Sequence, residues 1–82
     1  MPYVYILKSQ KDSSRTYIGK TVNVQQRLEE HNRGESPYTK TFTPWKLQTF
    51  IWFEDTKSAD DFEKYLKSGS GFAFMKKRLL PK

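Results

Sequence analysis

The sequence predicts an α+β fold in which a three-stranded antiparallel sheet is flanked by three helices, in the order ββαβαα. Two runs of aromatic and β-branched residues stand on either side of a short polar segment, which is typical of a hairpin. Further along, three segments carry apolar residues at helical spacing, and one more apolar run is typical of a strand. A chain of 82 residues has room for one modest core, so we expect a single domain over residues 1–82.

The hairpin is expected to bring two tyrosines together. If its loop closes symmetrically, Tyr5 lies opposite Gly19 and Leu7 lies opposite Tyr17. Side chains alternate between the two faces of a strand, so Tyr5 and Tyr17 then share one face. Gly19 leaves space beside the Tyr5 phenol, whereas a register slip of one residue would separate the tyrosines. The expected strands and loop are Tyr3–Leu7, Thr16–Gly19 and residues 10–14.

The first helix is expected to begin after Asn23 and to stop at Gly34, because asparagine caps helices and glycine ends them. At about 100° per residue, Arg27 and His31 fall on one border of the apolar stripe of this helix. Both side chains are therefore aimed at the sheet, where they can meet the face that carries the tyrosines. The apolar stripe consists of Val24 and Leu28.

A third strand is expected at residues 46–53, after a polar loop that contains two prolines. Its side chains are apolar on both faces, so we expect both faces to be covered. We also expect Trp45 and Trp52 in the core, because large aromatic side chains bury well. A second helix at residues 57–67 and a short third helix follow, separated by a Ser-Gly-Ser-Gly segment. The strand carries Leu47, Ile51 and Phe53 on one face and Phe50 and Trp52 on the other.

Composition excludes several classes of function. The chain has no cysteine, which excludes disulfides, thiolate nucleophiles and thiolate zinc sites. No segment approaches the roughly 20 apolar residues that span a bilayer, and the N-terminal apolar run is too short for a signal peptide. We therefore expect a cytoplasmic protein with no membrane partner. Lysine and arginine number 15 against 9 acidic residues, and the resulting charge of +6 favours a nucleic acid or another acidic partner.

Glu63 is a candidate metal ligand. It lies about 100° from Phe62, at the margin of the apolar stripe of the second helix, whereas Asp60 and Asp61 point outward. A carboxylate there would be a hard-oxygen ligand for Mg²⁺ or Mn²⁺. Taken singly, each candidate has an ordinary explanation. Tyrosines are common in strands, an arginine on a helix is usually solvated, a histidine often packs in a core, and a marginal glutamate usually faces water.

The order and spacing of these residues resemble the GIY-YIG nuclease superfamily. Tyr3–Tyr5 followed by Thr16–Gly19 resembles the two signature triplets, and Lys20–Gly34 resembles the helix that carries the arginine and, in one branch, the histidine. Glu63–Lys67 resembles the segment that holds the metal-binding glutamate. The chain is most similar to small stand-alone bacterial members, related to the N-terminal nuclease domain of the excinuclease ABC system and to Slx1-type nucleases. It departs from the family at Tyr3, where the first signature glycine stands, and at Phe72, where a basic residue is expected.

The resemblance implies an endonuclease that hydrolyses phosphodiester bonds in nucleic acid, with DNA favoured over RNA and one Mg²⁺ or Mn²⁺ bound by Glu63. Arg27 would grip a phosphoryl oxygen, Tyr5 would act as the base, and Tyr17 and His31 would position water or relay the proton. Substrate recognition would be structure-directed or weakly specific, or a protein partner would supply targeting, and the family suggests a link to repair or recombination. The expected substrate contacts are Lys20, Arg33, Tyr38 and Lys40.

Two alternatives of another class remain open at this point. The chain could be a non-catalytic or partner-dependent module that binds nucleic acid on the same scaffold, or an interaction domain whose basic surface binds an acidic protein. Binding alone would depend on lysine and arginine and would fall steeply with salt. Catalysis would depend on Glu63 and on metal. The sequence does not indicate an oligomeric state.

Overall fold

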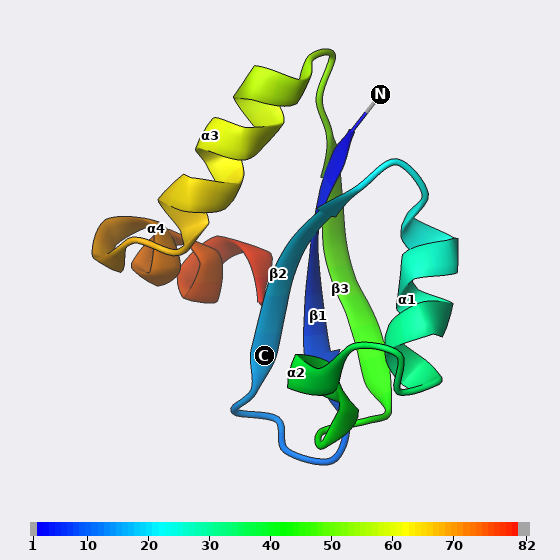
Figure 1. Ribbon diagram of the computed structural model, residues 1–82. Helices are drawn as coiled ribbons and strands as arrows, with labels where there is room; N and C mark the ends of the chain where they lie inside the picture. The colour runs from blue at the N-terminus through cyan, green and yellow to red at the C-terminus, as the bar shows by residue number, and fades with distance from the viewer. Residues whose placement is uncertain (1, 81–82) are drawn as a thin grey trace.

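The computed structural model describes residues 2–80 and has the predicted α+β architecture (Figure 1). A three-stranded antiparallel sheet runs through the centre, and helices pack on both of its faces. The final helix continues into a π-helical turn at Met75–Leu79. The elements are β1 (Tyr3–Ser9), β2 (Thr16–Thr21), α1 (Val24–Asn32), α2 (Pro37–Lys40), β3 (Trp45–Trp52), α3 (Thr56–Leu66) and α4 (Gly69–Phe74).

The hairpin has the predicted register. Tyr5 pairs with Gly19 and Leu7 pairs with Tyr17, so the two tyrosines share one face of adjacent strands. The strand order is β2-β1-β3, which places the strand that carries Tyr5 in the middle of the sheet. The sheet is thus built around the short aromatic run at the start of the chain, because that run pairs on both of its edges.

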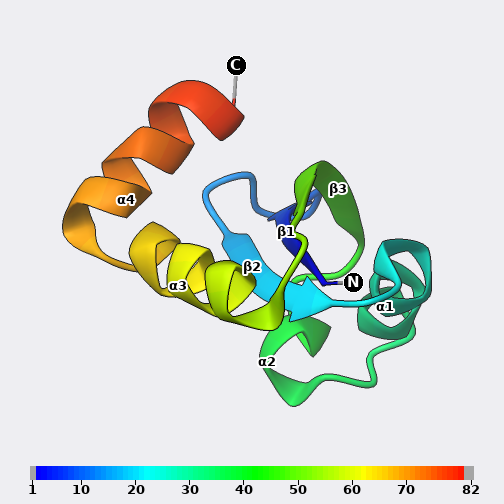
Figure 2. The ribbon, with the colours of Figure 1, turned by 90° about the horizontal axis from the view of Figure 1, so that it is seen from above.

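The helices form two layers around the sheet. Seen from above in Figure 2, α3 and α4 lie on one side of the strands and α1 lies on the other. Each side buries its own cluster of apolar side chains, so the central strand is covered on both faces. The α3-side core consists of Val4, Ile6, Ile18, Ala59, Leu66 and Met75. The α1-side core consists of Tyr5, Leu7 and Trp45, with Tyr17, Val24, Leu28, Phe42 and Leu47 packed against them.

A bulge in β3 changes which way its side chains point. Within the described strands, Gln48 has no partner on β1, since the register shifts by one residue there. As a result, Leu47 packs in the α1-side core, whereas Phe53 packs against the α3-side core. The expectation that Leu47 and Phe53 share a face is wrong, because one extra residue reverses the alternation of faces.

The two tryptophans have different environments. Trp45 is buried at 3% exposure, as expected for a core residue. Trp52 and its neighbour Phe50 are 51% and 52% exposed, so the expectation that both faces of β3 are covered along its length is wrong. Helix α1 covers the strand near Trp45, where Asn32 bonds the Trp45 backbone, but Phe50 and Trp52 lie beyond that contact.

The segment between α1 and β3 is more structured than predicted. Asn23 caps α1 by accepting a hydrogen bond from the Gln26 amide, and Gly34 ends this region with a φ of 78°, as the sequence indicated. The following residues were expected to form a polar loop, but they include the short helix α2, which begins at Pro37. Within residues 2–80, none of the helices is long and apolar enough to cross a membrane.

Candidate active site

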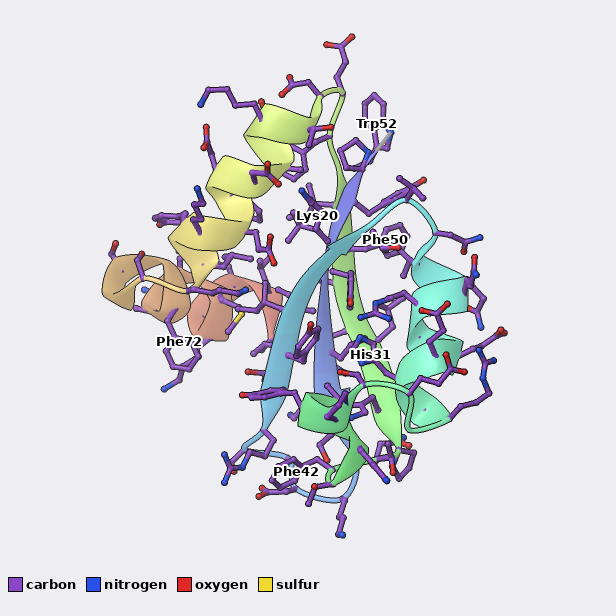
Figure 3. The ribbon with its side chains drawn as sticks, viewed as in Figure 1. Lys20, His31, Phe42, Phe50, Trp52 and Phe72 are labelled. Carbon is purple, nitrogen blue, oxygen red and sulfur yellow. The ribbon has the colours of Figure 1, made fainter. Side chains whose placement is uncertain are left out.

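A buried hydrogen-bonded chain joins the sheet to α1 and α2. The hydroxyl of Tyr5 lies 3.0 Å from His31 Nε2, and His31 Nδ1 lies 2.8 Å from the hydroxyl of Thr39. All three residues are at most 1% exposed. Figure 3 shows the His31 side chain reaching from α1 toward the sheet. The chain therefore fixes the His31 ring between a strand on one side and α2 on the other.

Both ring nitrogens of His31 have a hydroxyl partner, Thr39 at Nδ1 and Tyr5 at Nε2. Burial, assisted by the charge of Arg27, lowers the pKa of His31, so the ring is neutral near pH 7. A neutral ring has one donor nitrogen and one acceptor nitrogen, so one of the two hydroxyls donates to the ring and the other accepts from it.

The Tyr5 phenol is held in its protonated form. Burial raises the pKa of Tyr5 from 10.0 to about 12, with a smaller contribution from the neighbouring Tyr17. Arg27 lowers this pKa, but its effect is smaller than that of burial. The expected role of Tyr5 as a base needs the opposite shift, toward phenolate near pH 7. Burial of Tyr5 therefore favours the phenol over the phenolate.

Gly19 makes the position of Tyr5 possible. A Cβ atom at Gly19 would overlap the Tyr5 ring and its hydroxyl. The phenol therefore lies directly across the backbone of β2, in the space that the absent side chain leaves. The pairing of Tyr5 with Gly19 was predicted from the hairpin, and the structure supplies the reason that this residue is glycine.

Tyr17 lies on the accessible side of an aromatic cluster that it forms with Tyr5, His31 and Tyr38. Its ring centroid lies 4.8 Å from that of His31, 6.2 Å from that of Tyr5 and 5.8 Å from that of Tyr38. Unlike Tyr5, it is only partly buried and borders a cavity of about 500 Å³. Of the two paired tyrosines, Tyr17 is thus the one that a bound molecule can reach.

Arg27 is fixed at the edge of the cluster. Its Nη1 donates to Glu30 Oε1 at 2.8 Å, and this hydrogen bond is the main cause of the raised pKa of Arg27. The guanidinium also acts on the Tyr5 phenol and on His31, where it lowers both pKa values. About a third of the Arg27 side chain, 35%, remains exposed. The charge is therefore close to the buried chain yet open to a ligand.

Glu63 approaches the cluster from α3. Its charge raises the pKa of Tyr5 slightly, and its side chain is 22% exposed. One carboxylate oxygen pairs with Lys67 Nζ at 3.2 Å, one turn along the helix. Residues 2–80 contain no group of three histidine, cysteine or acidic side chains placed to share a metal ion. A single partly exposed carboxylate nevertheless fits Mg²⁺, which is commonly held by one or two carboxylates together with waters and substrate phosphates.

The remaining predicted substrate residues are placed differently from one another. Lys20 points to α3, where its ammonium pairs with Asp60. Asp60 was expected to point outward, but its partly exposed carboxylate pairs with Lys20 of β2. Arg33 pairs with Glu35 at 2.6 Å outside the cluster, and Lys40 is exposed at the end of α2.

Three functional positions were not found from the sequence. Thr39 orients His31, and its carbonyl also accepts from Trp45 Nε1 at 2.8 Å, yet it lies in a segment with no periodic pattern. Glu30, the partner of Arg27, follows the i,i+3 spacing of helical ion pairs, which is a signal that the sequence does carry. The pairing of Asp60 with Lys20 joins distant elements, so local spacing gives no sign of it.

Comparisons with known proteins agree on one family. The model of the GIY-YIG catalytic domain matches residues 1–78. A UPF0213 protein of Clostridium perfringens is 41% identical over 68 residues, which cover 82% of this chain and 71% of that protein. A UPF0213 protein of Haloquadratum walsbyi is 39% identical over 67 residues, covering 80% and 73%. The structure-specific endonuclease subunit slx1 of Schizosaccharomyces japonicus is 41% identical over 59 residues, covering 67% of this chain and 22% of that protein.

Proposed function

Because this chain belongs to the GIY-YIG family of nucleases, we propose that it hydrolyses phosphodiester bonds in DNA with the help of one bound Mg²⁺ or Mn²⁺. The observation that supports this proposal is the clustering of five polar side chains from four separate elements, with Tyr17 bordering a partly open cavity. A pure binding module has no need for a carboxylate beside buried tyrosines. These side chains are Tyr5, Tyr17, Arg27, His31 and Glu63.

Glu63 would hold the metal ion. A carboxylate that is partly exposed and already paired with an exposed lysine can exchange that partner for a cation. A bound divalent cation supplies charge stabilisation to the phosphoryl oxygens and to the leaving 3′-oxygen. The single carboxylate favours one ion over a two-metal arrangement, which would need further acidic ligands.

Arg27 would bind a non-bridging oxygen of the scissile phosphate. The planar guanidinium can donate two parallel hydrogen bonds to phosphate, which lysine cannot do. Glu30 accepts a hydrogen bond from one guanidinium nitrogen of Arg27, so the Arg27 side chain is oriented before substrate arrives. Such preorganisation reduces the entropy that binding would otherwise lose.

Tyr17 is better suited than Tyr5 to act on the attacking water. It borders the cavity, whereas the Tyr5 hydroxyl is buried and hydrogen-bonded to His31. We assign Tyr5 and His31 to positioning: together they fix the aromatic face against which Tyr17 packs.

We extend the proposal to structure-directed cleavage linked to repair or recombination, with a protein partner that supplies targeting. A domain of this size offers little surface for reading base sequence. The similar protein of Schizosaccharomyces japonicus is described as a structure-specific endonuclease subunit, which supports the proposal of structure-directed cleavage.

The decisive experiment compares Glu63→Gln with wild type and with Glu54→Gln. Glu54 is an exposed acidic residue before α3, so its substitution controls for the loss of one negative charge. Each protein is incubated with labelled duplex, flapped, branched and single-stranded DNA, in Mg²⁺, Mn²⁺ or EDTA. We expect metal-dependent cleavage that falls by about 100-fold or more in Glu63→Gln and is unchanged in Glu54→Gln. Cleavage that persists in Glu63→Gln would refute the assignment of the metal site. Salt-sensitive binding without cleavage in any metal would favour the non-catalytic module.

A further inference from the structure

A groove runs from Tyr17 to the far end of the hairpin. It consists of three hollows of about 500, 330 and 360 Å³. The first and second share Thr16 and Phe72 as lining residues, and the second and third share Lys8 and Ser13. Each hollow therefore adjoins the next, and the first is bordered by Tyr17 of the candidate active site.

Lysines line the groove along its length, and Lys67 in the first hollow is paired with Glu63. Among the residues that the structure describes, its lining includes a lysine in every hollow and contains neither aspartate nor glutamate. The whole chain, by contrast, has 9 acidic residues, so their absence from this lining is a local feature. A surface lined by lysines and free of carboxylates attracts the phosphates of a polyanion. The lysines are Lys67 in the first hollow, Lys8 and Lys76 in the second, and Lys8 and Lys46 in the third.

Two exposed aromatic rings stand where the groove leaves the active site. Phe72 is 45% exposed and forms a wall between the first two hollows, and Tyr38 is 71% exposed and lines the first. Figure 3 shows the Phe72 side chain standing clear of α4. Lys76 Nζ lies 5.3 Å from the centroid of the Phe72 ring, which places a cation beside this aromatic surface. An aromatic face next to a lysine can stack a nucleobase while the lysine contacts the phosphate.

We propose that this groove holds an unpaired strand of DNA that leads away from the scissile phosphate, with one nucleobase stacked on Phe72. Bases inside a duplex stack on one another and do not offer a free face, so aromatic side chains on the surface select unpaired nucleotides. The inference rests on the proposed function and names its substrate class: DNA with a single-stranded segment next to the cleaved bond.

Binding tests the groove without requiring cleavage. A labelled short oligothymidylate is titrated with protein in EDTA, and anisotropy gives the dissociation constant. We expect Phe72→Ala to weaken binding by about 5- to 150-fold, the range for one base stacked on an aromatic ring. Phe74→Ala is the matched control, since Phe74 is 38% exposed on the same helix but does not line the groove as residues 2–80 form it. Phe72→Tyr should bind as wild type does, because it keeps the flat ring.

The salt dependence of binding tests the lysines. Each phosphate contact on a single strand contributes about 0.7 to the slope of log K against log salt concentration. We therefore expect Lys76→Gln to reduce the slope by about 0.7 and Lys77→Gln, a neighbour outside the groove, to leave it unchanged. Equal effects of the two lysine variants, or equal effects of Phe72→Ala and Phe74→Ala, would overturn the proposed path.

Cleavage then separates this proposal from the proposed function. We expect a flapped duplex to be cut faster than a plain duplex, and Phe72→Ala to remove most of that difference. If wild type cuts both equally and Phe72→Ala changes neither, the groove proposal is wrong and the nuclease assignment stands. If wild type cuts nothing but binds the oligonucleotide through Phe72 and Lys76, the groove proposal stands and the nuclease assignment fails. Should Phe72→Ala fail to fold, Phe72→Leu keeps the apolar bulk and removes only the flat face.

Discussion

The substitution Tyr5→Phe removes the hydroxyl at the centre of the buried chain and leaves the ring in place. The Tyr5 hydroxyl lies 3.0 Å from His31 Nε2, so the variant leaves a buried ring nitrogen without its hydrogen-bond partner. An unsatisfied buried polar group costs about 1–3 kcal/mol. At pH 7 we expect Tyr5→Phe to unfold with a free energy lower than that of wild type by this amount.

The same hydroxyl makes the difference between the two proteins depend on pH. The pKa of Tyr5 is raised from 10.0 in a solvated chain to about 12 in the fold. Between these values the unfolded chain has lost the Tyr5 proton and the folded chain retains it. The unfolded state then binds fewer protons, so stability falls as pH rises. The shift corresponds to about 2.7 kcal/mol of unfolding free energy. This stability is present in full below pH 10 and is lost as pH rises through about 12.

Subtracting the two unfolding free energies isolates the contribution of the Tyr5 hydroxyl, because the two proteins differ in that group alone. Denaturant unfolding of wild type and Tyr5→Phe is measured from pH 7 to pH 12. The advantage of wild type should shrink by most of 2.7 kcal/mol above pH 10, so that the variant becomes equally or more stable. Tyr65→Phe, which removes a phenol that is 41% exposed, is the matched control. If the stability advantage of wild type over Tyr5→Phe stays constant between pH 10 and 12, or begins to fall well below pH 10, the conclusion that Tyr5 is buried and protonated is wrong.

Three further substitutions test the packing around the site. Gly19→Ala places a Cβ atom on the Tyr5 phenol, so we expect a loss of about 1–3 kcal/mol in unfolding free energy and a slower cleavage rate; near-neutral behaviour would show that the phenol can move aside. Thr39→Val keeps the shape but removes the hydroxyl that bonds His31 Nδ1, and should lower the unfolding free energy by about 1–3 kcal/mol and shift the Nδ1 resonance seen by nitrogen NMR; an unchanged Nδ1 resonance would contradict this hydrogen bond. Gly71→Ala places a Cβ atom against a backbone carbonyl of α3, and thermal melting should show a larger loss than for Gly69→Ala, which meets open space among residues 2–80.

Local patterns in the sequence were sufficient for the hairpin and for α1. The register that joins Tyr5 to Gly19 follows from the length of one short loop, and the limits of α1 follow from the cap Asn23 and the turn at Gly34. These features depend on residues that are close along the chain. Local side-chain chemistry determines them before any tertiary packing is considered.

Features that depend on contacts between distant segments were missed. Thr39 has no distinguishing local pattern, and its role arises only because α2 folds back onto His31. The exposure of Trp52 depends on where α1 stops covering the sheet, which strand alternation does not encode. The bulge at Gln48 arises from the pairing of β1 with β3, so the residue types in β3 do not predict it.

The fold gives two paired tyrosines opposite environments. They share one face of the sheet, but Tyr5 lies on the central strand beneath α1, whereas Tyr17 lies on the edge strand beside the groove. Burial keeps the inner phenol protonated and hydrogen-bonded, and the outer phenol meets the cavity. A single hairpin register thus places one tyrosine in the core and the other beside the cavity, and Gly19 is the residue that allows the inner ring to lie across the outer strand. On this reasoning Tyr17→Phe should lower the cleavage rate without a large change in stability, whereas Tyr5→Phe should lower both.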